Sequence, residues 1–181
     1  MDKKNKASAT KIPKILKESK FSPLAIEVIK KLKQSGFQGY LVGGCVRDSL
    51  AGIKAKDFDV STNATPEEVR KIFRSSRIIG KRFRLVHVFS RSELIEVSTF
   101  RANASKKDSG SGVVKDSEGK ILRDNVWGTL EEDCIRRDFS VNALYFDPIE
   151  NHLCDFHNGL QHIQKKILVS IGDPLIRFEE D

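Results

Sequence analysis

Apolar side chains recur at helical spacing in two segments of the chain. The first follows Ser22-Pro23, which can start a helix, and runs to about Gln34, with Gly36 as a C-terminal cap. Its apolar stripe has the i, i+3, i+4, i+7 spacing: Ala25, Val28, Ile29 and Leu32. The second starts at Thr65-Pro66, where Thr65 and Glu68 match a capping box before further apolar residues. Both patterns predict amphipathic helices packed on a core.

Alternating and continuous apolar runs predict strands between and after these helices. In the segment 84–90, Leu85, His87 and Phe89 are predicted to lie on one face and the two valines between them on the other. Further strands are predicted at 39–42, 58–61, 77–80, 94–100 and 152–156, and further helices at 46–50, from Thr129 and at 159–165. The 181 residues suffice for one sizeable domain of mixed α+β type.

The composition excludes several classes of protein. With 39% hydrophobic residues the chain can bury a core, yet it holds no apolar run near the roughly 18 residues of a membrane span. The lysine-rich N-terminus lacks the apolar centre of a secretory signal. Three cysteines without CxxC spacing argue against a disulfide framework or a zinc site. We therefore expect a cytoplasmic protein without a membrane segment.

The net charge of +7 is unevenly placed along the chain. Residues 1–20 hold seven lysines and two acids, a net +5, and are expected to form a basic disordered tail. A second basic segment, residues 69–92, holds eight arginines and lysines and no acid. Such a run is usually a solvated face, but its length inside a domain favours a polyanion surface, with Arg82 and Arg84 as candidates for RNA binding.

The stretch from Leu41 to Thr62 holds the candidate chemistry. Gly43-Gly44 lies between a predicted strand end and a short helix that contains Arg47. Glycines at such a junction let backbone N–H groups approach a phosphate, and the helix N-terminus and the arginine add positive charge and donors. A double glycine alone is more often a tight turn, so the acidic pair downstream is what favours the phosphate site.

Asp57 and Asp59 are two carboxylates one residue apart in a strand-like segment. Because side chains alternate along a strand, both lie on one face while Phe58 and Val60 point toward a core. Mg²⁺ prefers oxygen ligands and usually takes one or two carboxylates together with substrate phosphates. Two such ions can activate an attacking oxygen and stabilise a leaving one. Asp57 and Asp59 are therefore candidate ligands for Mg²⁺, although such a pair alone is a weak signal.

Glu96 lies in the middle of a mostly apolar predicted strand. A lone carboxylate in such a place is costly to bury unless it is paired or bound to a cation. Periodicity alone leaves two interpretations open: a solvent-facing residue of an edge strand, or a third acid beside Asp57 and Asp59.

Residues 102–125 are polar and rich in glycine and serine. We expect a mobile loop that adds little to the core and orders over nucleotide or primer, because loops of this length are often functional.

Several blocks of the sequence resemble the class II nucleotidyltransferases, which comprise bacterial poly(A) polymerases and tRNA CCA-adding enzymes within the polymerase beta superfamily. The blocks occur in the family's order: GGCVRDSLAG at 43–52, KDFDVST at 56–62, IEVSTFR at 95–101, EEDCIRRDFSVNALYFDP at 131–148 and DFHNGLQHIQKKIL at 155–168. The resemblance extends over about residues 37–181. It implies an α+β head domain of polymerase-beta type, a mixed β-sheet flanked by helices.

The resemblance also implies roles for individual residues. Gly43, Gly44, Arg47 and Arg137 would hold the nucleotide phosphates, and Asn142 would support the site. Asp138 and Glu96 would join Asp57 and Asp59 as active-site acids. Near the end, Arg177 to Asp181 resembles a block that reads the base edge and continues to an arginine, which is absent here, so Asp181 is a further nucleotide-binding candidate. Residues 21–172 would be the head domain, and 173–181 the start of a truncated neck.

The implied reaction is template-independent nucleotidyl transfer with two Mg²⁺ ions. An RNA 3′-hydroxyl attacks the α-phosphorus of ATP and pyrophosphate leaves. The segment 80–88, GKRFRLVHV, resembles poly(A) polymerases, whereas CCA-adding relatives usually lack its RFRL element. Polyadenylation of RNA is therefore the favoured function, with tRNA CCA addition as the alternative. Protein partners are not indicated by the sequence.

A catalytically inert module that binds RNA or nucleotide is the alternative of another class. The four acids are intact, which argues that the parent protein is catalytically active. The truncated neck argues that this chain alone is inactive. Incorporation of CTP against ATP on tRNA lacking its end separates the two enzymes, and titration of ATP with Mg²⁺ separates binding from turnover.

Overall fold

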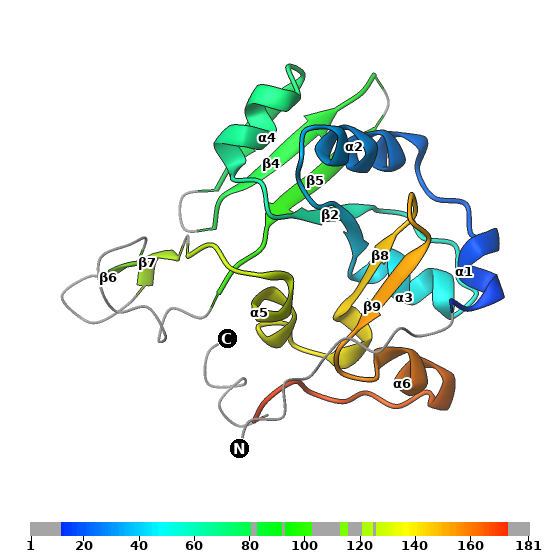
Figure 1. Ribbon diagram of the computed structural model, residues 1–181. Coiled ribbons are helices and arrows are strands. Elements are labelled where there is room, and N and C mark those ends of the chain that lie inside the picture. Colours follow the sequence, from blue (N-terminus) through cyan, green and yellow to red (C-terminus); the bar gives the residue numbers. More distant parts are fainter. Residues whose placement is uncertain are drawn as a thin grey trace.

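The computed structural model describes residues 12–80, 83–91, 93–102, 113–115, 121–124 and 126–173. Within these ranges the chain forms a seven-stranded sheet with the order β3-β4-β5-β2-β1-β8-β9 (Figure 1). Its strands are β1 (Tyr40–Val42), β2 (Asp59–Thr62), β3 (Ser76–Ile79), β4 (Leu85–Phe89), β5 (Leu94–Thr99), β8 (Leu144–Asp147) and β9 (His152–Asp155). Strands β2 and β5 are parallel and the other neighbours are antiparallel, which makes the sheet mixed, as predicted.

The described helices are α1 (Lys14–Glu18), α2 (Pro23–Gln34), α3 (Gly44–Leu50), α4 (Pro66–Ile72), α5 (Leu130–Ile135) and α6 (Gly159–Lys165), with a 3₁₀ turn at Ser140–Asn142. Two predicted helices form for the local reasons given above. The Ser22 hydroxyl accepts a hydrogen bond from the Ala25 amide at the start of α2, whose apolar stripe is buried. Thr65 and Glu68 cap the first turn of α4 reciprocally, as a capping box does.

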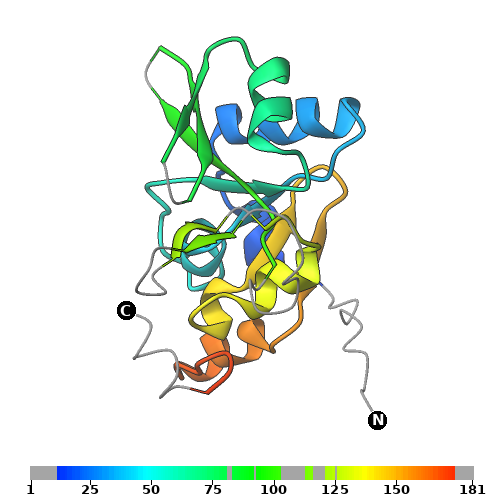
Figure 2. The ribbon, with the colours of Figure 1, turned by 90° about the vertical axis from the view of Figure 1, so that its left-hand side faces the viewer.

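Helices cover one face of the sheet. Apolar residues of α1, α2, α3 and α4 pack there against the inward side chains of the strands, including Val60, Val86 and Val97. Figure 2 shows α2 and α4 on the same side of β4 and β5. The predicted alternation in 84–90 is confirmed, because Val86 and Val88 are buried in this core while Leu85, His87 and Phe89 are not.

Described residues cover only half of the second face of the sheet. Strand register places seven residues in one row across the sheet: Arg77, His87, Glu96, Asp59, Val42, Tyr145 and Cys154. Residues directly opposite each other share a face. Val42, Tyr145 and Cys154 lie in a second core beneath α5, whereas Glu96 faces solvent. Asp59 therefore stands at the boundary between a covered half and an open half.

The N-terminal segment differs from the expected tail of residues 1–20. Residues 1–11 lie outside the described structure, but Lys14–Glu18 forms α1 and Leu16 is completely buried in the main core. Ile12 packs against the same core, four residues earlier. The lysine count led to the prediction of a tail, although Ile12 and Leu16 have the i, i+4 spacing of a helical face.

Two short strands occur within the segment predicted as a mobile loop, 102–125. Val113–Lys115 (β6) and Ile121–Asp124 (β7) pair antiparallel as a separate two-stranded sheet. Ala102 is buried, and the other positions of the segment lie outside the described residues. Residues 174–181, which include most of the expected neck segment, also lie outside them. Among the described helices, none has the length and apolar character needed to cross a membrane.

Because Leu16 is buried, Leu16→Ala should lower the free energy of unfolding by about 2–5 kcal/mol. Ile15→Ala, on the exposed side of the same short helix, is the matched control and should cost less than about 1 kcal/mol. Urea denaturation followed by circular dichroism measures both. Equal small losses would show that α1 does not belong to the core.

Candidate active site

Asp59 and Glu96 stand side by side because β2 and β5 pair in parallel with these residues opposite each other. Burial raises the pKa of Asp59, the charge of Glu96 raises it further, Arg137 lowers it, and Asp57 adds a last increase. The Glu96 side chain is 48% exposed. Each of the two interpretations of Glu96 is therefore correct in part. Glu96 faces solvent, but it lies on an internal strand and not on an edge strand, and it is adjacent to Asp59.

Asp57 precedes β2 by two residues and is exposed. Phe58 packs against the main core and Val60 is buried in it, so the prediction that these two residues point toward a core is confirmed. The electrostatic influence of Asp57 on Asp59 indicates that the two carboxylates lie near each other. Together with Glu96 they form a concentration of negative charge on the open half of the sheet.

Gly43 ends the β1 strand and caps α3 with φ 72° and ψ −134°, a conformation that only glycine adopts without strain. A Cβ built on Gly43 would lie 3.8 Å from the Arg137 guanidinium (Nη1) and 3.9 Å from the Asp59 carboxylate (Oδ2). A Cβ on Gly44 would lie 3.6 Å from Nη2 of Arg47. The double glycine thus leaves a cradle open between two arginines and one acid.

Arg137 is held by a buried network at the end of α5. Its Nε donates to the Tyr145 hydroxyl at 2.7 Å, and that hydroxyl donates to the Asp133 carboxylate at 2.7 Å. The guanidinium also lies over the Tyr145 ring, 5.0 Å from its centre. Although burial alone would lower the pKa of Arg137, Tyr145 and Asp133 raise it above its ordinary value. The arginine is therefore a fixed positive charge beside the cradle.

Arg47 belongs to a second chain of contacts. Its Nη1 donates to the Asn142 side-chain oxygen at 2.8 Å, and Asn142 in turn donates to the Asp138 carboxylate at 3.3 Å. The Phe139 amide also donates to Asp138, at 2.7 Å. The structure thereby brings together three predicted residues, Arg47, Asn142 and Asp138. Within the described residues, no hydrogen bond joins Asp138 to Asp59 or Glu96.

Sequence reasoning missed Asp133 and Tyr145. Asp133 lies four residues before Arg137, a spacing at which helical side chains meet, and it also accepts a hydrogen bond from the Arg101 amide at 3.1 Å. Tyr145 occupies an apolar strand, where a buried hydroxyl needs a polar partner. Both signals are present in the sequence, but only the fold joins them.

The remaining predicted residues lie apart from the carboxylates or outside the described structure. Arg84 sits on the helix-covered side, where its Nη1 pairs with the Glu67 carboxylate of α4 at 2.6 Å. Arg82 and Asp181, predicted for RNA and nucleotide binding, fall outside the described residues.

The donor set of the open half suits a hard cation. Asp57 and Asp59 offer oxygen ligands only, and a bound cation would offset the burial and the Glu96 charge that raise the pKa of Asp59. Across the described ranges, no three or more acids, histidines or cysteines converge on a single metal position. The residues therefore fit Mg²⁺ that takes its other ligands from phosphate and water.

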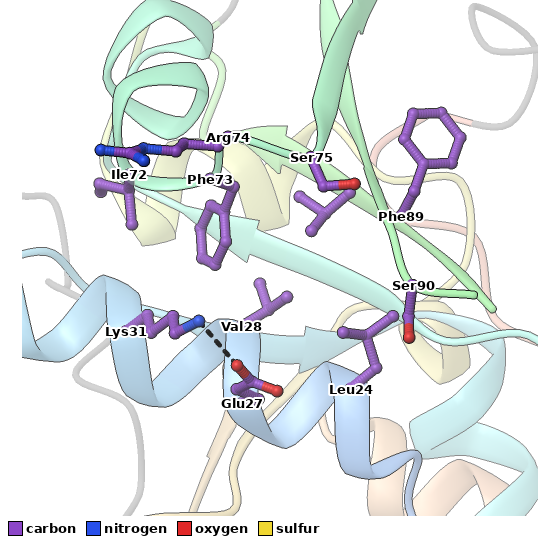
Figure 3. A pocket seen from close by; sticks show the side chains of 11 residues that line it. Leu24, Glu27, Val28, Lys31, Ile72, Phe73, Arg74, Ser75, Phe89 and Ser90 are labelled. Carbon is purple, nitrogen blue, oxygen red and sulfur yellow. Dashed lines mark ion pairs between the residues drawn. The ribbon is translucent and has the colours of Figure 1, made fainter. Parts of the chain in front are cut away.

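A pocket of about 440 Å³ opens elsewhere, between α2, the end of α4 and the tip of the β4–β5 hairpin (Figure 3). Phe73 and Val28 face each other across its floor, and Glu27 and Lys31 at its rim form an ion pair of 2.7 Å. This pocket lies on the helix-covered side of the sheet. Its acid is already paired, so its chemistry does not match that of a metal site.

Comparisons with known proteins agree with one another. A sequence family described as "Poly A polymerase head domain" matches residues 39–169. Poly(A) polymerase I of Haemophilus influenzae is 49% identical over 162 residues, which are 89% of this chain and 36% of that protein. The CCA-adding enzyme of Bacillus licheniformis is 35% identical over 161 residues, 87% of this chain and 37% of that protein.

Among solved structures, the Bacillus stearothermophilus CCA-adding enzyme in complex with CTP matches with a TM-score of 0.69 and 33% identity, over 89% of this chain and 37% of that one. The chain thus spans about a third of the length of the relatives it matches.

Asp59→Asn should raise the melting temperature by a few degrees at neutral pH in Mg²⁺-free buffer. Because the folded-state pKa of Asp59 is raised, its charge costs stability above that pKa, and the cost disappears as the pH falls below the ordinary carboxyl pKa of about 4. Thermal denaturation across that range measures the difference, which should close at the acidic end. Added Mg²⁺ should stabilise the parent more than the variant. A variant less stable than the parent at neutral pH would refute the assigned repulsion.

Proposed function

Because the chain belongs to the family of poly A polymerase head domains, we propose that it is the catalytic head of a polynucleotide adenylyltransferase, which adds AMP from ATP to RNA 3′ ends. The observation that supports this most strongly is the carboxylate pair Asp59 and Glu96 beside the cradle at Gly43 and Arg137. A reduced, cytoplasmic setting belongs to the proposal, in keeping with three buried free thiols.

The nucleotide triphosphate is proposed to occupy the cradle above Gly43-Gly44. Arg137 borders it on one side and Arg47, which also pairs with Asp48, on the other, so two guanidinium groups lie near the proposed position of the phosphates. Arg137 is fixed by Tyr145, and Arg47 by Asn142, before any ligand arrives. Such prior positioning lowers the reorganisation that phosphoryl chemistry requires.

Asp57 and Asp59 would hold two Mg²⁺ ions, which when bound polarise the α-phosphate and lower the proton affinity of the attacking hydroxyl. Glu96 adjoins Asp59 with half its side chain exposed, where it can orient the RNA 3′-hydroxyl. The 3′-oxygen then bonds to the α-phosphorus as the bond to the oxygen that bridges the β-phosphate breaks. Pyrophosphate leaves on the arginine side, and the hydroxyl proton passes to Glu96 and from there to water.

Asp138 has a supporting role in this proposal. Its carboxylate accepts from Asn142, and Asn142 accepts from Arg47, so Asp138 orients the amide that holds the arginine. This keeps Asp138 among the active-site acids predicted from sequence, on the Arg47 side of the cradle rather than beside Glu96.

Addition of CCA to tRNA is the second candidate. It is favoured by the 35–36% identity to CCA-adding enzymes and by the structural match to one of them in complex with CTP. Identities of 44–49% to proteins named poly(A) polymerase I favour adenylate addition instead.

Nucleotide binding by this chain should depend on Arg137 and show little base preference. Arg137→Gln should weaken ATP–Mg²⁺ binding at least about tenfold, because a charge-assisted contact to phosphate is lost. The side chains around the cradle are proposed to contact only the phosphates, which are the same in all four nucleotides. The affinities for ATP, CTP, GTP and UTP should therefore differ by less than about tenfold. Isothermal titration measures all four. A larger preference for ATP would place base recognition within this chain.

Transfer should require both aspartates. In the protein extended to the length of its relatives, Asp57→Ala and Asp59→Ala should each lower AMP incorporation into RNA by at least about a hundredfold, because each removes a metal ligand. Labelled ATP and CTP, offered with a generic RNA and with tRNA lacking its end, separate the two candidate functions. Incorporation of CTP restricted to tRNA would replace polyadenylation by CCA addition, and near-parental activity of either variant would reject the metal assignment.

A further inference from the structure

Four residues form a patch on the open half of the sheet, outward from the carboxylates: Arg77, His87, Phe89 and Leu94. Register places Arg77 opposite His87, and Phe89 opposite Leu94. Phe89 and Leu94 are 38% and 40% exposed and form the last pair before the turn of the β4–β5 hairpin. The His87 and Phe89 rings meet edge to face with 6.1 Å between their centres. We call these four residues the outer-strand patch.

The outer-strand patch is continuous with the candidate active site. His87 Nε2 lies 3.2 Å from the Glu96 carboxylate, and Glu96 is opposite Asp59. With strands about 4.8 Å apart, His87 stands roughly 10 Å and Arg77 roughly 14 Å from Asp59 along the row. A molecule bound on the patch would therefore end at the carboxylates.

The order of residues in the row assigns opposite sides to the two substrates. Gly43 and Arg137 lie on the β1 and β8 side of Asp59, where the triphosphate and the leaving pyrophosphate are proposed to bind. The attacking and leaving oxygens of a phosphoryl transfer are roughly in line with the phosphorus. The RNA that carries the attacking 3′-hydroxyl must then approach from the other side of Asp59, which is the side of β5, β4 and β3.

The charges of the two nearby arginines support the same direction. In the described part of the chain, the Arg77 side chain is exposed and makes no ion pair or hydrogen bond. Arg84, by contrast, points to the helix-covered side and is paired with Glu67. Of these two members of the basic segment, Arg77 is the one that shares a face with Asp59 and Glu96 and has its positive charge available.

We infer that the outer-strand patch binds the single-stranded 3′ end of the RNA, an inference that rests on the proposed adenylyl transfer. The exposed Phe89 ring offers a stacking platform for a base near the 3′ end, with His87 at its edge and Leu94 extending the apolar surface. Arg77 holds a backbone phosphate on the outermost strand. This combination of one aromatic face, one free guanidinium and an adjacent catalytic acid suits unpaired RNA rather than a duplex, whose bases are not available for stacking.

The test is binding of a short single-stranded RNA with a free 3′-hydroxyl to this chain, measured by fluorescence anisotropy over a range of salt concentrations. Phe89→Ala should weaken binding about tenfold, and Phe89→Trp should retain it, since a larger ring still stacks. Arg77→Gln should reduce the slope of log affinity against log salt by about 0.7, the share of one phosphate contact. Lys30→Gln, which removes an exposed positive charge from α2 on the helix-covered side, is the matched control and should leave affinity for RNA close to the parent.

A 4-thiouridine at the RNA 3′ end should also crosslink to the peptide that contains residues 85–96. The inference fails if Phe89→Ala and Lys30→Gln bind RNA equally well, if the crosslink maps to the helix-covered side, or if duplex RNA binds as tightly as the single strand. ATP–Mg²⁺ binding by the same variants separates this failure from failure of the proposed function. Retained ATP binding with an unchanged RNA affinity rejects the patch alone, whereas absent ATP binding in the parent rejects the nucleotidyltransferase assignment itself.

Discussion

The parallel pairing of β2 with β5 is the constraint on which the candidate site depends. It holds Asp59 opposite Glu96, with Asp57 nearby, so that like charges accumulate on one part of the sheet. The arrangement is tolerable because that part faces solvent and because Arg137 stands beside it. Burial and, after it, the charge of Glu96 raise the pKa of Asp59, and a bound cation would offset both effects. This pair of carboxylates in the centre of the sheet therefore favours the binding of a cation together with its phosphate ligands.

The division of the second sheet face explains how one row of residues serves two purposes. Beneath α5 the row supplies core residues, Val42 and Tyr145, and the Tyr145 hydroxyl links Arg137 to Asp133. Beyond Asp59 no described element covers the same row, which carries polar and charged side chains there. The covered half thus fixes the positive group of the site, and the open half leaves room for a substrate. Gly43 lies where the two halves meet. Its conformation requires glycine, and because glycine has no side chain, the space between Arg137 and Asp59 stays open.

Local signals in the sequence predicted the local structure well. The cap of Ser22 and the capping box of Thr65 and Glu68 involve residues within one helical turn, so α2 and α4 could be placed without the fold. The partner of Glu96 could not, because parallel pairing joins strands 37 residues apart and nothing near Glu96 encodes its register. Helix α1 was missed because the burial of Leu16, rather than helix propensity, stabilises five residues in a lysine-rich segment. A count of positive charges likewise cannot tell Arg77 from Arg84, because only the fold brings Glu67 of α4 next to Arg84.

Anomalous diffraction from crystals of the chain grown with Mn²⁺ and a non-hydrolysable ATP analogue tests the central claim most directly. Mn²⁺ shares the oxygen preference of Mg²⁺ and reports its own position. The account predicts anomalous density against Asp57 and Asp59, with the triphosphate over Gly43-Gly44 between Arg47 and Arg137. Density in the pocket between α2 and α4, or a triphosphate bound away from the double glycine, would contradict it.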